Sequence, residues 1–88
     1  MSNVLKPAPH VVSRVVQGSA LILDNQRDEV QQLNEVGSFI WDKIMEGQST
    51  QDEISRALFD HFEVTRDQIE RDLSTFLDVL RSRKLLLE

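Results

Sequence analysis

The stretch from Glu29 to Trp41, EVQQLNEVGSFIW, changes its hydrophobic period without an intervening loop. Its first five residues follow a polar turn and contain β-branched Val30, which indicates a short strand. Asn34 can then cap a helix, and the apolar residues after it recur at a helical spacing. A strand that ends so abruptly is a candidate sheet edge, and an unpaired edge can bind an extended peptide.

Two further short strands are predicted before this one. Residues 10–16 are rich in valine, and residues 17–19 contain Gly18, which accepts a positive φ in a turn. Residues 20–23 form a second apolar run, and a polar turn at 24–28 leads into the third strand. Three short strands at this spacing predict an antiparallel meander.

Three helices are predicted after the strands. The first spans about residues 35–46 and ends at Gly47, a residue suited to a left-handed C-terminal position. The second spans about residues 51–62 and the third about residues 66–83. Each of these two helices follows a capping-box pattern, and these patterns are Thr50 with Glu53 and Thr65 with Gln68.

Strands followed by helices predict an α+β fold, with the helices on one face of a three-stranded antiparallel sheet. A winged helix-turn-helix is the most economical arrangement of these elements. Residues 1–9, which contain both prolines, are expected to form an extended N-terminal segment, and residues 10–88 a single domain. Residues 85–87 are expected to pack back on the core as an extended tail.

The composition restricts the function classes. The net charge of −5 disfavours non-specific binding to nucleic acid, which depends on neutralising phosphates. There is no cysteine and no apolar run near the ~20 residues of a membrane span, so we expect a cytoplasmic protein that does not bind membranes.

Motifs for catalysis are nearly absent. The two histidines, His10 and His61, are far apart and belong to no metal-binding spacing, and the three glycines are too scattered for a phosphate-binding loop. The acidic residues of the third helix alternate with arginines, which is typical of a solvated face. We therefore expect neither enzymatic activity nor a cofactor or metal.

Two alternatives to peptide binding follow from the same elements. A helix-turn-helix could bind DNA as a transcriptional regulator, although residues 66–83 carry four positive and four negative side chains and are neutral overall. The leucines at 85–87 could instead support a dimerising interaction module. In favour of a peptide groove, Val79 lies beyond the main apolar stripe of the third helix; it either widens that stripe into a groove wall or caps the core.

Residues 30–41 are followed by GQST at 47–50, EI at 53–54 and DLSTFLDVL at 72–80. The order and spacing of these blocks resemble the y-x-LN-x-x-a-x-x-IW signature and the D-V-x-x-F-L-x-x-L block of PqqD-like proteins. The resemblance covers roughly residues 10–88. That family includes a peptide chaperone of pyrroloquinoline quinone biosynthesis and the recognition elements of enzymes that modify ribosomally made peptides.

The resemblance implies a non-catalytic winged helix-turn-helix domain that binds the leader segment of a precursor peptide. The leader would add as a strand to the third strand and lie against the third helix. The usual protein partner is a modifying enzyme such as a radical SAM protein, or a leader protease. Carried over to this chain, the peptide-binding residues are Glu29, Val30, Gln31, Gln32 and Leu33 in the strand and Asp72, Thr75, Phe76, Val79 and Arg83 in the helix.

Other positions are assigned structural roles. Leu33 and Asn34 are expected to close the strand and cap the helix, and Trp41 to lie in the core. Lys84 stands where the family usually has glycine, so the last turn of the third helix is predicted not to need a left-handed C-terminal residue. The residues before the third strand favour the broader family over its quinone-pathway member.

Overall fold

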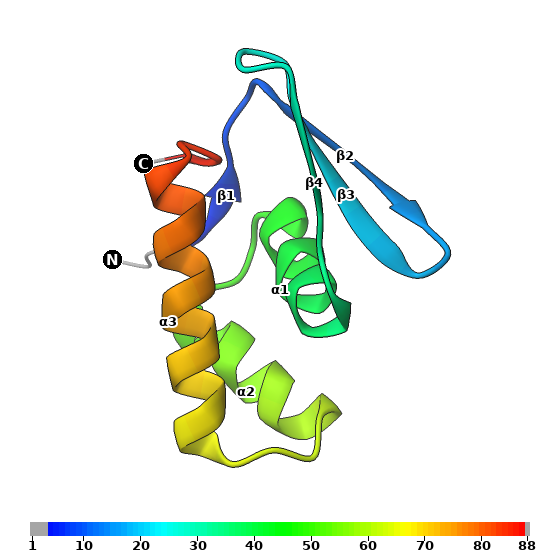
Figure 1. The fold of residues 1–88 in the computed structure, drawn as a ribbon. Coiled ribbons are helices and arrows are strands. Elements are labelled where there is room, and N and C mark those ends of the chain that lie inside the picture. Colours follow the sequence, from blue (N-terminus) through cyan, green and yellow to red (C-terminus); the bar gives the residue numbers. More distant parts are fainter. Residues whose placement is uncertain (1–3, 88) are drawn as a thin grey trace.

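A three-stranded antiparallel sheet is followed by three helices (Figure 1). The computed structural model describes residues 4–87. The sheet has the strand order β2 (Val11–Val16), β3 (Ser19–Asp24), β4 (Glu29–Gln32). The helices are α1 (Glu35–Glu46), α2 (Gln51–His61) and α3 (Arg66–Ser82). The predicted α+β order is confirmed.

The β2–β3 hairpin turns through two residues. Gln17 and Gly18 have φ values of 52° and 82°, so both occupy the left-handed region that a tight hairpin turn requires. Val16 pairs with Ser19, and the register continues to Val11 opposite Asp24. The sequence identified the glycine of this turn but not the strained glutamine beside it.

Side-chain caps fix the starts of α1 and α2. The Asn34 Oδ1 accepts a hydrogen bond of 2.7 Å from the Gly37 N–H, as the N-cap prediction required. At α2, the Thr50 Oγ1 accepts from the Glu53 N–H while the Glu53 Oε1 accepts from the Thr50 N–H. This reciprocal pair is the predicted capping box.

The cap of α3 has only half of the predicted pattern. The Thr65 hydroxyl accepts from the Gln68 N–H at 3.2 Å. The Gln68 side chain does not return to Thr65, and its Nε2 instead donates to the Asp72 Oδ1 at 2.9 Å. The amide has a carboxylate acceptor one turn along the helix, and a charged acceptor makes the stronger hydrogen bond.

The expectation for Lys84 is wrong. Lys84 has a φ of 59°, so it takes the left-handed conformation that the family's glycine would adopt. Its N–H donates to the Arg81 carbonyl, and the Leu85 N–H donates to the Leu80 carbonyl, which together form a Schellman motif. The turn brings Leu85 back onto the core, where it is 2% exposed, and burial of that leucine offsets the strain at the lysine.

The two ends of the described chain pair with each other. β1 (Lys6–Pro7) is antiparallel to β5 (Leu86–Leu87), and the Ala8 N–H donates to the Leu85 carbonyl at 2.9 Å. Leu85 and Leu86 are buried, as expected for a tail that packs back on the core. Residues 4–9 therefore join the fold through the tail and also through the loop before α2, where the Leu5 N–H donates to the Ser49 carbonyl at 2.9 Å. Residues 1–3 lie outside the described part of the chain.

The core lies between the inner face of the sheet and the helices. Its largest fully buried side chains are Trp41, Ile22, Ile40, Ile44, Ile54, Leu58, Leu73, Leu77 and Leu80. Trp41 and Ile40 belong to the segment of residues 29–41, which contains β4 and the first half of α1. Their burial therefore anchors the edge strand to the helices. The predicted core role of Trp41 is confirmed.

Candidate functional site

β4 carries an open backbone edge. Within residues 4–87 it pairs only with β3, and in Figure 1 it is the strand of this sheet that lies toward α3. The Leu33 N–H donates to the Ala20 carbonyl at 2.9 Å. Hydrogen-bonded and non-bonded pairs alternate along an antiparallel ladder. Val30 and Gln32 therefore direct their N–H and C=O groups away from β3.

A groove of about 530 Å³ lies between β4, the start of α1 and α3. Its lining is Gln31, Gln32, Leu33, Asn34, Val36, Gly37, Ile40, Arg71, Asp72, Thr75, Phe76, Val79 and Leu80. The middle is apolar, where half-buried Phe76 and 39%-exposed Val79 face Leu33. Polar groups lie at the Asn34 end. The groove thus joins a row of unpaired backbone groups to an apolar wall.

The structure brings most of the predicted site residues together. Seven of the ten line the groove, and these are Gln31, Gln32, Leu33, Asp72, Thr75, Phe76 and Val79. Val30 is 65% exposed and pairs with Leu23, so its side chain lies on the outer face of the sheet while its backbone faces the open edge. Val79 is exposed and does not cap the core.

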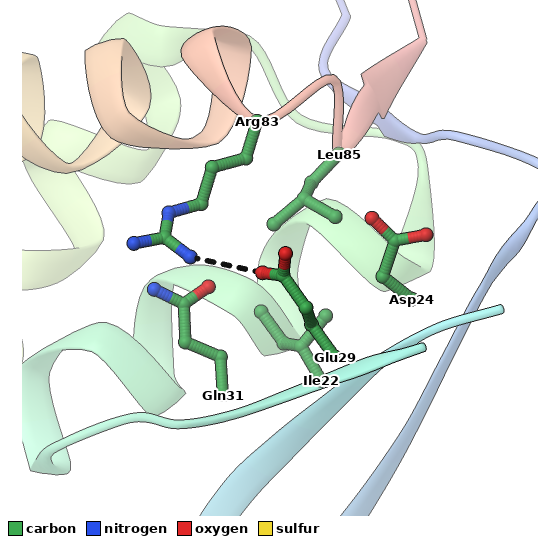
Figure 2. Close-up of a pocket in the computed structure, with 6 residues that line it drawn as sticks. All are labelled: Ile22, Asp24, Glu29, Gln31, Arg83 and Leu85. Atoms are coloured by element: carbon green, nitrogen blue, oxygen red, sulfur yellow. Dashed lines mark hydrogen bonds and ion pairs between the residues drawn. The ribbon is translucent and has the colours of Figure 1, made fainter. Parts of the chain in front are cut away.

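Glu29 and Arg83 meet at the other end of the groove. The Arg83 Nη1 lies 3.5 Å from the Glu29 Oε2, and Figure 2 shows the two side chains reaching toward each other from α3 and β4. With Gln31 they line a small cavity of about 10 Å³ over Ile22 and Leu85. Gln31 lines both hollows, so the ion pair stands where the groove ends.

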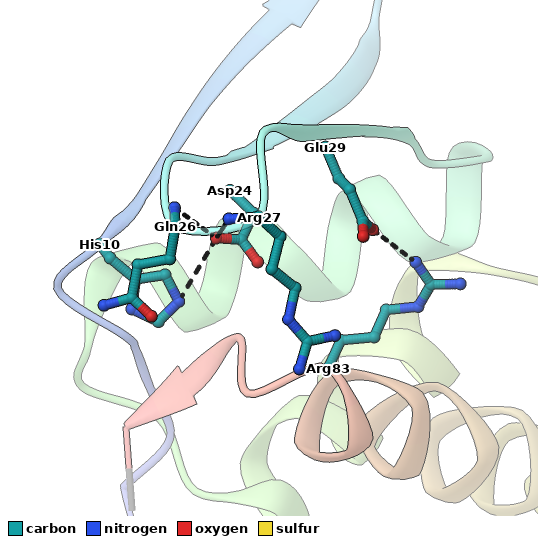
Figure 3. Close-up of polar contacts among 6 residues, drawn as sticks. All are labelled: His10, Asp24, Gln26, Arg27, Glu29 and Arg83. Atoms are coloured by element: carbon teal, nitrogen blue, oxygen red, sulfur yellow. Dashed lines mark hydrogen bonds and ion pairs between the residues drawn. The ribbon is translucent and has the colours of Figure 1, made fainter.

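The turn before β4 is held by Asp24 (Figure 3). This buried carboxylate accepts hydrogen bonds from the Gln26 and Arg27 N–H groups at 3.0 and 3.2 Å. The His10 Nε2 lies 3.7 Å from the same oxygen. Asp24 also pairs with Glu29 across the ladder and thereby fixes where β4 begins.

Six lining residues were not among the predicted peptide contacts: Asn34, Val36, Gly37, Ile40, Arg71 and Leu80. Val36 and Ile40 lie one helical turn apart, and that spacing was the available signal for their shared face. Gly37 has a steric role. A Cβ there would lie 3.1 Å from the Asn34 Oδ1 and 3.4 Å from the Phe76 Cε1, so glycine permits Phe76 to approach α1.

A second depression lies between α2 and α3. It is lined by Asp52, Ser55, Arg56, Phe59, Asp60, Arg66 and Glu70. Acidic side chains outnumber basic ones there, which suits phosphates poorly. The described residues contain no group of three or more histidine, aspartate or glutamate side chains that could hold a metal ion. Within the same range, no helix is long and apolar enough to cross a membrane.

Comparisons with known proteins agree with this geometry. Residues 19–86 match the family described as coenzyme PQQ synthesis protein D (PqqD). The structure of TbiB1 in complex with the TbiA(beta) leader peptide is 34% identical, with a TM-score of 0.85 over 92% of this chain and 93% of that one. The search of curated proteins found no match.

A second solved structure, lasso peptide synthetase B1 complexed with the leader peptide, is 23% identical. It has a TM-score of 0.83 over 96% of this chain and 98% of that chain, so it supports the fold. Both of these solved structures are complexes with a leader peptide. This chain belongs to the PqqD family.

Proposed function

We propose that this protein is a non-catalytic adaptor that captures the leader segment of a ribosomally made precursor peptide. The observation that carries the proposal is the open edge of β4 facing the groove beside α3. Support comes from the family match and from TbiB1, whose structure holds a leader peptide. The ten predicted residues of β4, Leu33 and α3 form the proposed contact surface.

The guest segment binds as a fourth strand. Val30 and Gln32 each offer one N–H and one C=O group to it, and these backbone bonds give affinity for any extended sequence. Selection comes from alternate guest side chains, which point into the groove against Phe76 and Val79. Each apolar side chain buried there contributes about 1–2 kcal/mol.

The adaptor presents the captured peptide to a modifying enzyme such as a radical SAM protein, or to a leader protease, in the cytoplasm. In this proposal the adaptor binds the peptide and the partner enzyme carries out the reaction. The groove holds an amide-rich edge, an apolar wall and isolated charges, which suit recognition and offer no paired nucleophile and base.

Titration of the ¹⁵N-labelled protein with precursor peptides encoded near its gene tests the proposal. We expect the largest chemical-shift changes in residues 29–33 and in residues 72–83, which cover the second half of α3 and its C-cap. Slowed amide exchange at Val30 and Gln32, with little change at Gln31, would identify strand addition specifically. Saturable binding that leaves these residues unperturbed would contradict the proposed site.

The same titration with duplex DNA tests the alternative function, a DNA-binding regulator. Since the chain carries a net charge of −5 and residues 66–83 have no net charge, we expect no binding to DNA at low salt. Binding to DNA that weakens steeply with salt and maps to the exposed face of α3 would favour a DNA-binding transcriptional regulator instead.

A further inference from the structure

We propose that Arg83 selects an acidic side chain in the guest segment and that Glu29 competes for the same guanidinium. This inference rests on the proposed function and specifies the class of peptide that the groove prefers. It places the acidic guest residue at the end of the groove where β4 begins.

The first step is the position of Arg83. It is the C-terminal cap of α3, and its side chain crosses from the helix to the first residue of β4. A guest strand that pairs with Val30 and Gln32 runs along β4 and therefore passes this guanidinium as it leaves the groove. In Figure 2 the guanidinium lies above Gln31, the residue that lines both the groove and the small cavity.

The second step is the weakness of the existing contact. A single Nη1–Oε2 approach of 3.5 Å joins the pair, and the Arg83 and Glu29 side chains are 46% and 53% exposed. Within residues 4–87, Glu29 is the side chain that accepts a hydrogen bond from Arg83. Arginine has five N–H donors arranged for two parallel bonds to one carboxylate, and this contact uses one of them. A guest carboxylate can therefore add to or replace Glu29 at little cost.

The third step is the contrast with the opposite end of the groove. There, Asp72 stands next to Arg71 and already accepts a hydrogen bond from Gln68 at 2.9 Å. The apolar centre around Phe76 and Val79 carries no charge. The preference for an acid thus belongs to one end, which orients the guest and fixes its register.

The test uses a displayed library of random peptides selected on the full-length protein. We expect the selected peptides to share an acidic residue at one position flanking an apolar pair. A selected peptide and its alanine derivative at that position are then compared by fluorescence anisotropy. We expect the acidic peptide to bind roughly two- to fivefold more tightly, the range of an exposed ion pair, with less difference at high salt.

Two substitutions should move this affinity ratio in opposite directions. Arg83→Gln should bring the ratio close to one, whereas Glu29→Gln should increase it, because the competing carboxylate is gone. Arg81→Gln is the matched control, since it removes the same charge two residues before the cap, in a side chain that lies 3.7 Å from Asp78.

The outcomes separate the two proposals. A ratio near one in the unaltered protein, or an equal loss in Arg81→Gln and Arg83→Gln, would overturn the role of Arg83 while leaving peptide capture intact. Selected peptides that bind without perturbing residues 29–33 and α3 would instead overturn the capture site itself.

Discussion

At the scale of single residues, two left-handed positions terminate helices in this fold with different side chains. Gly47 ends α1 with a φ of 69°, at no steric cost. Lys84 follows α3 with a φ of 59° and carries the penalty of a Cβ in that conformation. The lysine tolerates the strain because Leu85 beyond it is buried.

Replacing Lys84 by glycine should therefore stabilise the protein by about 0.5–1 kcal/mol, since the strain is relieved while some chain entropy is lost. Urea unfolding measures the change. Lys84→Ala is the control, because it removes the same side chain but retains the Cβ, and it should give no gain. Gly47→Ala should lose about 1 kcal/mol. Equal stability of Lys84→Gly and Lys84→Ala would show that the turn is unstrained.

The capping box of α2 should affect how the unfolding free energy decreases at acidic pH. Hydrogen bonds from the backbone and then the hydroxyl of Thr50, with a smaller contribution from Arg56, lower the pKa of Glu53 below its ordinary value of 4.5. A lowered folded pKa means that the stabilisation is present above the unfolded pKa and is lost as the pH falls through the folded one.

The measurement is unfolding free energy between pH 6 and about 2.5 for the parent, Glu53→Gln and Thr50→Ala. Glu53→Gln should show a shallower loss of stability below about pH 4.5. Thr50→Ala keeps the backbone N–H that bonds Glu53, so its acid slope should change less, but it should lose about 1 kcal/mol at neutral pH. An unchanged acid slope in both variants would show that this carboxylate does not contribute.

At the scale of elements, β4 works through its backbone more than through its side chains. Hydrogen-bonded and non-bonded pairs alternate along the ladder, so the Val30 N–H points outward and the Gln31 N–H points toward β3. Proline is tolerated on an edge strand when its missing N–H faces outward.

Val30→Pro should therefore weaken guest binding roughly three- to tenfold, the worth of one hydrogen bond, while the sheet persists. Val30→Ala is the matched control, because it removes the exposed side chain and keeps the N–H. Calorimetric titration gives the affinities, and thermal melting reports whether each variant folds. If the alanine and proline variants bind equally, the guest does not pair with this edge.

Local patterns predicted the elements well, and long-range contacts explain the rest. Asn34 and Thr50 were identifiable as caps because the acceptor and the N–H it binds are three residues apart. The β1–β5 pair joins two-residue strands from opposite ends of the chain, so neither has a periodic signal. The left-handed conformation of Lys84 is locally unfavourable, and it is compensated only by the burial of Leu85 in the folded core.

The candidate site divides in the same way. Family blocks pointed to β4 and α3, and seven of those ten residues share one groove. Arg71 and Gly37 were not expected there, since their place depends on how α1 and α3 cross. The pairing of Glu29 with Arg83 spans 54 positions and had no sequence signal.

At the scale of the molecule, residues 5–8 cover the C-terminal tail at 85–87. Ala8 is 6% exposed, Leu5 packs against the core, and the Ala8 N–H holds the Leu85 carbonyl. A chain limited to residues 10–88 would lose these contacts and expose Leu86 to water.

We expect that truncation to lower the unfolding free energy by about 2–4 kcal/mol, the worth of one or two buried aliphatic side chains. Urea unfolding of both forms measures it. Leu86→Ala supplies a double-mutant cycle: it should cost less in the truncated chain, where the leucine is already exposed. Strictly additive losses would mean that the first residues and the tail stabilise the fold independently.

The pairing of Lys6 with Leu87 also bears on modular architecture. Antiparallel partners lie only about 5 Å apart, so the chain enters and leaves this domain at neighbouring points. A unit of that kind can be spliced into a surface loop of a larger host without stretching the host's backbone. The same geometry that closes the fold would thus let one gene deliver recognition and chemistry as a single polypeptide.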